Sequence, residues 1–435
     1  MKTGRLAGAA YLAASSFAAV NVLNAYRPLA RRGQGSIISF ATGFVTSEIP
    51  RGSVGLSVAE SVVALSRGAA RSTAGKLGLA LSAASVAGLI GLELRARPAE
   101  AILDSALRAG LGPDYLDDVL HPARPDSDKT IQSQPSLLRT LRANKRYAHH
   151  SDIGYGPAGS RNHLDIWRRG DLPPDGTAPV LVQVHGGAWM FGNKLGQAYP
   201  LMSHLVERGW ICVSLNYRLS PRSTWPDQIL DVKRAVAWVK QHIDEYGGDP
   251  NFVAITGGSA GGHLTALHAL TAADRTWQPD FEDVDTSVVA AVPFYGVYDW
   301  TNRDGHREDD VRDLLEKHVI KDSFEDAWKV FDAASPMSHV RVDAPPFFCL
   351  HGNNDTLVPV AQARAFVRRL REVSTSPVVY AEFPGAQHAF DVFASTRANA
   401  AAEAVERFLG VVYGEYQGRS RPVATGLEAG QPQPA

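Results

Sequence analysis

The sequence is poor in cysteine and carries almost no net charge, and each shortage excludes a class of protein. The 435 residues include only two cysteines, Cys212 and Cys349. Both lie in apolar runs, so there is no disulfide framework or zinc-site spacing, and we expect buried thiols. The net charge of −1 argues against nucleic acid as a partner. No internal repeat typical of a solenoid or propeller is present. The length predicts a core domain with an appended region.

The N-terminal portion is basic and apolar. Residues 1–100 carry 11 Lys and Arg against 4 Glu. Apolar runs at 6–26 and 77–92 have basic flanks, and an amphipathic helix is expected at 54–65. Each run is marginal as a membrane span, since crossing takes about 20 apolar residues, and no convincing signal-peptide cleavage site follows. The pattern predicts contact with an anionic membrane surface, and thus a membrane-associated or cell-envelope location. The alternative is an ordinary helical region of a cytoplasmic protein.

The pattern of apolar residues in the remaining chain changes at about residue 147. A helical pattern at 99–120 leads into a proline-containing linker, and short apolar runs then alternate with amphipathic helices. Strands are expected at 163–167, 180–184, 211–215, 252–256, 288–292, 346–350 and 378–383, with helices at 229–243, 360–370 and 400–409. Strands that are apolar on both faces and separated by helices predict a mostly parallel sheet covered on each side. The predicted parts are 1–98, 99–146, a catalytic domain at 147–414 with an insertion at 299–342, and a disordered Gly/Pro/Gln-rich tail at 415–435.

The most informative motif is the glycine-rich turn 257–262, which contains Ser259. A strand-like run at 252–256 precedes it, and a helix is expected from about His263. This arrangement is typical of a nucleophile elbow, in which a serine hydroxyl projects from a sharp strand-to-helix turn. The glycines let strand and helix approach where a Cβ atom would clash. The motif therefore predicts a serine hydrolase.

Partners for the serine follow in a fixed order. Asp355 comes just after a predicted strand, and His388 comes 33 residues later, after the next one. The carboxyl ends of parallel strands meet at one edge of a sheet, where ligands bind. Taken alone, Asp355 is as well explained as a turn residue and His388 as an ordinary histidine. The order serine, aspartate, histidine behind an elbow predicts a nucleophile, an orienting acid and a base.

Backbone donors for an oxyanion are expected in another loop. The strand at 180–184 runs into His185, Gly186 and Gly187, and glycines there allow consecutive amide groups to point at one spot. We expect the amides of Gly186, Gly187 and Ala260 to form the oxyanion hole. His185, together with His263 and His351, is expected to be structural, because the base in this order follows the acid.

Together the motifs at 185–189, 216–221 and 257–262, with Asp355 and His388, resemble those of the hormone-sensitive-lipase-like carboxylesterases. The closer resemblance is to a bacterial subgroup with an N-terminal helical extension. It covers about residues 147–412 and implies an eight-stranded α/β-hydrolase fold, hydrolysis of carboxylic esters with short to medium acyl chains, and no metal or organic cofactor. Ala188 stands where the family motif has a third glycine. Asn193 and Lys194 are also similar to a pair found in arylformamidases and feruloyl-type esterases.

The resemblance implies a lid as well as a reaction. We expect the 299–342 insertion, helped by the helix at 99–120, to cover the pocket. Deleting residues 1–98 should then spare hydrolysis of short soluble esters while releasing the protein from membranes. The alternatives are an amidase or arylformamidase that uses the same triad, and a non-catalytic binding module, which the presence of His388 argues against. The substrate is expected to be a small-molecule or lipid ester.

Overall fold

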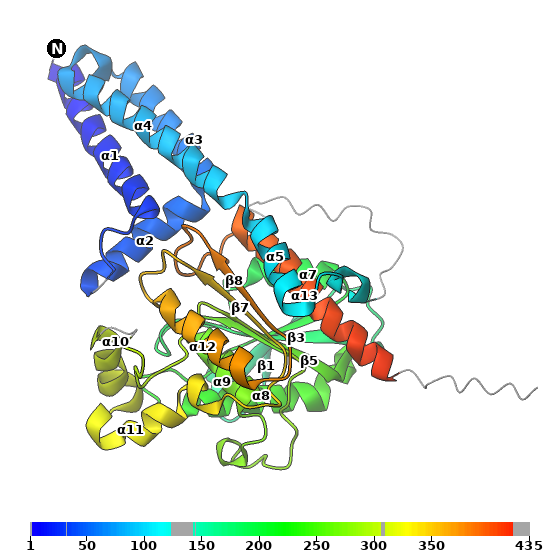
Figure 1. The fold of residues 1–435 in the computed structure, drawn as a ribbon. Coiled ribbons are helices and arrows are strands. Elements are labelled where there is room, and N and C mark those ends of the chain that lie inside the picture. Colours follow the sequence, from blue (N-terminus) through cyan, green and yellow to red (C-terminus); the bar gives the residue numbers. More distant parts are fainter. Residues whose placement is uncertain (1, 32, 123–141, 144, 306–308, 421–435) are drawn as a thin grey trace, which may run out of the picture.

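The computed structural model describes residues 2–31, 33–122, 142–143, 145–305 and 309–420 (Figure 1). Its centre is an eight-stranded sheet of order β1-β2-β4-β3-β5-β6-β7-β8. The strands are β1 (Ala148–Gly154), β2 (His163–Trp167), β3 (Ala178–Val184), β4 (Ile211–Leu215), β5 (Gly248–Gly258), β6 (Ala291–Phe294), β7 (Phe347–Gly352) and β8 (Val378–Phe383). The pairs β1–β2 and β2–β4 are antiparallel and the others parallel. The predicted mostly parallel α/β-hydrolase sheet is confirmed.

Two strands differ from the sequence prediction. The strand β1 was missed because its residues, Ala-His-His-Ser-Asp-Ile-Gly, have little of the apolar character that marks a buried strand. It lies at the edge of the sheet, where one side needs no partner strand. The sequence predicts a strand at 288–292, but the corresponding strand β6 runs from Ala291 to Phe294. It begins there because Ala291 is the first residue that pairs with both β5 and β7.

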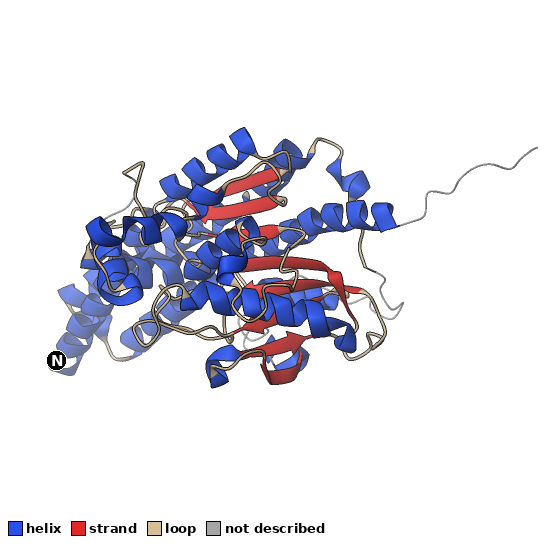
Figure 2. Cartoon of the chain, turned by 90° about the horizontal axis from the view of Figure 1, so that it is seen from below, coloured by secondary structure: helices blue, strands red, loops and turns tan. Residues whose placement is uncertain are grey.

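Helices cover both faces of the sheet, and their apolar sides form two separate cores (Figures 1 and 2). One core includes Leu264 and Phe366, and the other includes Leu103, Met202 and Phe408. The first face carries α8 (Asp227–His242), α9 (Ala260–Leu270) and α12 (Val360–Val373), and the second carries α5 (Ala99–Leu111), α7 (Tyr199–Glu207) and α13 (Thr396–Ser420). The last helix continues beyond the predicted start of the tail at 415, and residues 421–435 lie outside the described chain.

The N-terminal helices form an arm that projects from the sheet (Figure 1). They are α1 (Lys2–Tyr26), α2 (Gln34–Glu48), α3 (Pro50–Ser66) and α4 (Thr73–Ala96). Small residues allow α1 and α4 to pack closely, since a Cβ on Gly78 would lie 2.8 Å from the ring of Tyr11, and one on Gly88 would lie 2.5 Å from Val22. Both helices are long and apolar enough to cross a membrane. The helix expected at 54–65 is present as part of α3, but Leu56, Val58 and Val62 point outward and are exposed.

The arm is joined by polar contacts to the loop after β7 and to α13. Asn354 donates its side-chain amide to the carbonyl of Ala25, and the Thr356 hydroxyl donates to the carbonyl of Ser36. Glu48, at the end of α2, forms an ion pair of 2.8 Å with Arg397, and both side chains are almost fully buried. Deleting residues 1–98 would remove these contacts, although Thr356 would keep Gln387 and Arg397 would keep the carbonyl of Pro384. The packing argues against a harmless deletion, and its effect on activity stays a prediction.

The predicted contribution of residues 99–120 to a lid also needs correction. Helix α5 packs against β8 and α13, and its side chains Leu103 and Leu107 belong to a core beneath the sheet. The N-terminal helix that reaches His388 is α2, whose Phe40 ring lies 5.8 Å from the ring of that histidine.

The insertion after residue 299 forms two helical pieces. They are α10 (Asp309–Leu314), continued by a π-helical turn (Leu315–Ile320), and α11 (Phe324–Ala333). The Trp225 amide donates to the carbonyl of Val319, which ties the first piece to the body of the domain. The carbonyl of Ala334 accepts from His263 of α9, the helix that follows Ser259. Short 3₁₀ segments complete the fold at 69–71, 115–118, 159–162, 243–246, 275–277 and 336–339.

Candidate active site

Ser259 occupies the sharp turn between β5 and α9. Its φ and ψ of 59° and −121° are unusual for a residue with a side chain, and such a conformation costs on the order of 1–3 kcal/mol. Neighbouring glycines make the turn sterically feasible. A Cβ on Gly257 would lie 2.6 Å from the carbonyl oxygen of Gly261, and one on Gly261 would lie 2.1 Å from that of Val184. The elbow predicted from sequence is therefore present, with its helix starting at Ala260.

Asp355 and His388 meet below this edge of the sheet. The Nδ1 atom of His388 lies 2.6 Å from Oδ2 of Asp355, and both side chains are buried. The other carboxylate oxygen of Asp355 accepts from the amides of Leu357 and Val358. Burial opposes ionisation, but the nearby His388 and His351 outweigh it and hold the pKa of Asp355 well below its usual range. An ionised Asp355 holds the proton of His388 on Nδ1, which leaves Nε2 as the basic nitrogen.

Two residues that the sequence analysis did not single out position the histidine. Gln387 accepts hydrogen bonds from the amides of both Thr356 and His388, at 2.8 and 2.9 Å, and so links the aspartate loop to the histidine loop. The ring of Tyr295 lies 4.5 Å from that of His388. Its hydroxyl lies where a Cβ on Gly258 would be only 2.6 Å away. Tyr295 thus spans from His388 to the serine turn. Gln387 could have been suspected because it directly precedes His388.

A buried carboxyl group lies next to this tyrosine. The Tyr295 hydroxyl donates to Asp391, and burial raises the pKa of Asp391 to about 6. Burial, reinforced by the charge of Asp391, also raises the pKa of Tyr295 well above its usual range. The hydroxyl therefore keeps its proton and remains a hydrogen-bond donor at neutral pH, which anchors the ring beside His388.

The loop after β3 lies directly beside the serine, as expected. A Cβ on Gly186 would lie 3.2 Å from Cβ of Ser259. The predicted donor Gly186, however, is already used, because its amide donates to the side-chain oxygen of Gln197 at 2.7 Å. Within the described chain, the amides of Gly187, Ala188 and Ala260 donate to no protein acceptor. These three amides, rather than that of Gly186, are available to a ligand.

The other histidines near the motifs have structural partners. His185 stacks on Tyr217 and contacts the carbonyl of Gly186, and burial lowers its pKa to about 4. His263 accepts from the indole of Trp189 and donates to a carbonyl, and burial lowers its pKa to about 3. His351 contacts Asp355 at 3.2 Å and also the carbonyl of Val358. None of these rings is placed to replace His388.

Lys194 also has a structural environment. Its ammonium group lies 2.6 Å from Asp165 and 2.8 Å from Asp152, and its backbone amide donates to Asn216. These contacts fix the segment that follows the oxyanion loop. The pair of Asn193 and Lys194 therefore braces the loop through protein contacts.

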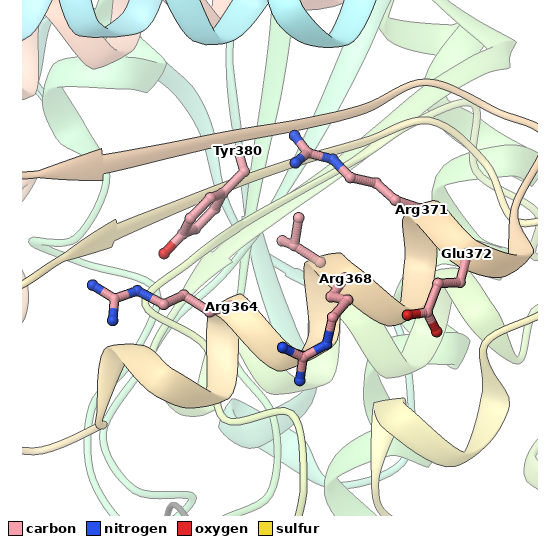
Figure 3. A pocket seen from close by; sticks show the side chains of 6 residues that line it. Arg364, Arg368, Arg371, Glu372 and Tyr380 are labelled. Atoms are coloured by element: carbon pink, nitrogen blue, oxygen red, sulfur yellow. The ribbon is translucent and has the colours of Figure 1, made fainter.

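A recess lies elsewhere, on α12 and β8 (Figure 3). It has a volume of about 390 Å³ and is lined in part by Arg364, Arg371 and Tyr380. Arg364 is held by Glu382, and Arg371 donates to the carbonyl of Val378. No member of the triad lines this recess, so it does not compete with the elbow as the candidate active site.

Comparisons with known proteins agree with the geometry. A family profile described as BD-FAE matches residues 164–370. A protein named as a probable carboxylic ester hydrolase, LipM of Mycobacterium tuberculosis, is 51% identical over 96% of this chain and 96% of its own length. The esterase LipQ of the same organism is 53% identical over 71% of this chain and 73% of its own length.

A solved structure supports the same assignment. The butyrate-bound structure of the thermophilic esterase Est2 from Thermogutta terrifontis is 25% identical and superposes with a TM-score of 0.51. The match covers 62% of this chain and 95% of that chain. The chain therefore belongs to the hormone-sensitive-lipase-like carboxylesterases, the α/β-hydrolases that cleave carboxylic esters.

Proposed function

We propose that Ser259 attacks the carbonyl of a carboxylic ester while Nε2 of His388 takes its proton, and that Asp355 orients the imidazole. The alcohol leaves with a proton returned by His388, and water then hydrolyses the acyl-serine intermediate. The observation that carries this proposal is the buried 2.6 Å contact between His388 and Asp355, at the sheet edge that also presents the elbow serine. His388 takes the proton of Ser259 and gives it to the leaving alcohol, then takes a proton from the attacking water and returns it to Ser259.

The developing oxyanion needs donors that no protein group has taken. The amides of Gly187, Ala188 and Ala260 meet this requirement, whereas the amide of Gly186 is bonded to Gln197. A preorganised donor of this kind contributes about 2.7–4 kcal/mol to transition-state stabilisation. We assign the oxyanion hole to these three amides, and Gln197 fixes the loop that carries two of them.

Ester hydrolysis is favoured over amide hydrolysis by the contacts of Lys194 and by the relatives. The amidase alternative drew support from Asn193 and Lys194, but the ammonium of Lys194 is held by Asp165 and Asp152. The close relatives named above are ester hydrolases.

A substrate panel tests the proposed reaction. We expect the purified full chain to hydrolyse p-nitrophenyl esters, and to act on the matching anilide and on N-formyl-arylamines at least ~100-fold more slowly in kcat/KM. A fluorophosphonate probe should label the protein at Ser259, since only an activated serine reacts. Faster turnover of the N-formyl substrates than of the esters would instead identify an arylformamidase, and no labelling would indicate a binding module.

The N-terminal arm supports a second part of the proposal, contact with a membrane. Most exposed large apolar side chains of the described chain lie in the first 96 residues, including Leu6, Phe17, Leu23, Ile38, Leu56, Val62, Leu77 and Leu94. Exposed apolar surface of this extent marks an interaction site rather than a solvated face. The excess of Lys and Arg in this part favours an anionic lipid surface.

Sedimentation with lipid vesicles tests this contact. We expect the full chain to pellet with vesicles that contain anionic lipid and to remain bound in high salt, because burial of apolar side chains is not screened by ions. Detergent should release it. A protein that stays in the supernatant without detergent, or that high salt releases completely, would contradict insertion of the apolar arm.

A further inference from the structure

Helix α2 crosses the catalytic centre itself. At its start, the carbonyl of Ser36 accepts from Thr356, which follows the catalytic aspartate. Near its middle, the ring of Phe40 meets that of His388 edge-on, with centroids 5.8 Å apart. At its end, Glu48 binds Arg397. An α-helix rises about 1.5 Å per residue, so these 15 residues reach from one catalytic loop to the start of α13.

The approach of α2 is close because one position carries no side chain. A Cβ on Gly43 would lie 3.0 Å from the side-chain nitrogen Nδ2 of Asn24 and 3.7 Å from the side-chain nitrogen Nε2 of Gln387. Gln387 is the residue that joins the loops of Asp355 and His388. The helix therefore rests on the connection between the acid and the base.

Three phenylalanines form a continuous row that starts at the histidine. Phe40 stacks on Phe44 with ring centroids 5.5 Å apart, and Phe44 stacks on Phe393 at 4.9 Å. All three side chains are only partly buried, so part of each ring is open to a ligand. We call Phe40, Phe44 and Phe393 the aromatic strip. It offers apolar surface that is continuous with the catalytic base.

The outer side of α2 is apolar too. Ile37, Ile38 and Val45 are exposed, and the helix carries no charged residue between Gln34 and Ser47. A helix that is uncharged on its outer side and aromatic beside the catalytic histidine suits a substrate that comes from a hydrocarbon environment, because removing apolar surface from water is favourable.

We propose that α2 forms one wall of the substrate site and that the aromatic strip receives the hydrocarbon chain of a lipid-type ester. The inference rests on the proposed hydrolysis at Ser259 and specifies its substrate class. It goes beyond the preference for short to medium acyl chains that the family resemblance implies. The chain lies along the rings of Phe40, Phe44 and Phe393, with the ester carbonyl at Ser259.

Chain-length selectivity tests this assignment. The full chain, its Phe44→Ala and Phe44→Leu variants and a control, Leu116→Ala at an exposed apolar position away from α2, are compared in detergent micelles. One series of substrates varies the acyl group of p-nitrophenyl esters from acetyl to dodecanoyl, and another varies the alcohol of acetate esters from ethanol to dodecanol. These two series distinguish an acyl chain from an alkyl alcohol as the group that the strip holds. The readout is the ratio of kcat/KM for the longest substrate to that for the shortest.

We expect Phe44→Ala to lower this ratio by ~10-fold in one of the two series. Loss of contact with one or two methylene groups of the substrate reduces selectivity by about this factor. Phe44→Leu should lower it less, because it keeps an apolar side chain, and Leu116→Ala should leave it unchanged. An unchanged ratio in both series, or an equal fall in Phe44→Ala and Leu116→Ala, would overturn the strip while leaving ester hydrolysis in place. A wild-type chain that hydrolyses no ester would overturn the proposed function itself.

Discussion

The Ser259→Ala variant is expected to lose ester hydrolysis by a factor of about 10⁵–10⁶ in kcat, as found for the nucleophile of other triad hydrolases. The variant removes the only atom that forms the acyl intermediate. It leaves the amides of Gly187, Ala188 and Ala260 in place, so a small rate above the uncatalysed reaction should remain. The measurement is p-nitrophenyl acetate hydrolysis at saturating substrate, together with loss of fluorophosphonate labelling.

The fold should survive this substitution. Ser259 already adopts its positive φ with a Cβ atom present. The hydrogen bond that its backbone N–H donates to the carbonyl of Phe294 does not involve the side chain. Alanine adds no steric demand. Ser338→Ala is a suitable control, because it also removes a hydrogen-bonded hydroxyl, at an exposed position. Residual activity within ~10-fold of wild type, with a normal circular dichroism spectrum, would show that another group is the nucleophile.

The Arg397→Met variant is expected to show the largest loss of stability. Arg397 is 1% exposed and pairs with Glu48, which lies on α2 and is also buried. Removal of the guanidinium leaves a buried carboxylate that retains hydroxyl partners, Ser395 at 2.8 Å and Ser47 at 3.2 Å, but no cation. Breaking such a pair costs about 3–5 kcal/mol. The urea midpoint should fall, and limited proteolysis should reveal the arm detaching from the catalytic domain.

Two comparisons sharpen this result. The double variant Glu48→Met/Arg397→Met should recover most of the loss, because apolar replacement of both partners leaves no buried charge. Arg51→Met breaks a pair with Glu93 in which the arginine side chain is 72% exposed, and should cost only about 0.2–1 kcal/mol. If Arg397→Met and Arg51→Met had equal effects, the junction of α2 with α13 would not depend on the buried ion pair.

Local sequence patterns were sufficient for the catalytic domain. A strand buried on both faces must be apolar along its length, and a serine elbow must have glycines at its close contacts. Both features can therefore be recognised in the local sequence. Asp355 and His388 were found for the same reason, since each follows a strand whose end lies at the active edge. The edge strand β1, with one side unpaired and few apolar residues, has no such feature.

Contacts between distant segments could not be deduced in this way. The sequence analysis assigned an oxyanion role to Gly186 because nothing local indicates that its amide bonds to Gln197. It also separated the first 98 residues from catalysis, because no periodicity shows that Phe40 lies beside His388 or that Glu48 pairs with Arg397. The sequence by itself determined the kind of sheet, and it supplied the proposed triad of Ser259, Asp355 and His388. Only the tertiary structure decided which amides remain free and which helix covers the site. The first depends on how the loop after β3 folds back so that Gln197 reaches Gly186, and the second on packing between residues hundreds of positions apart.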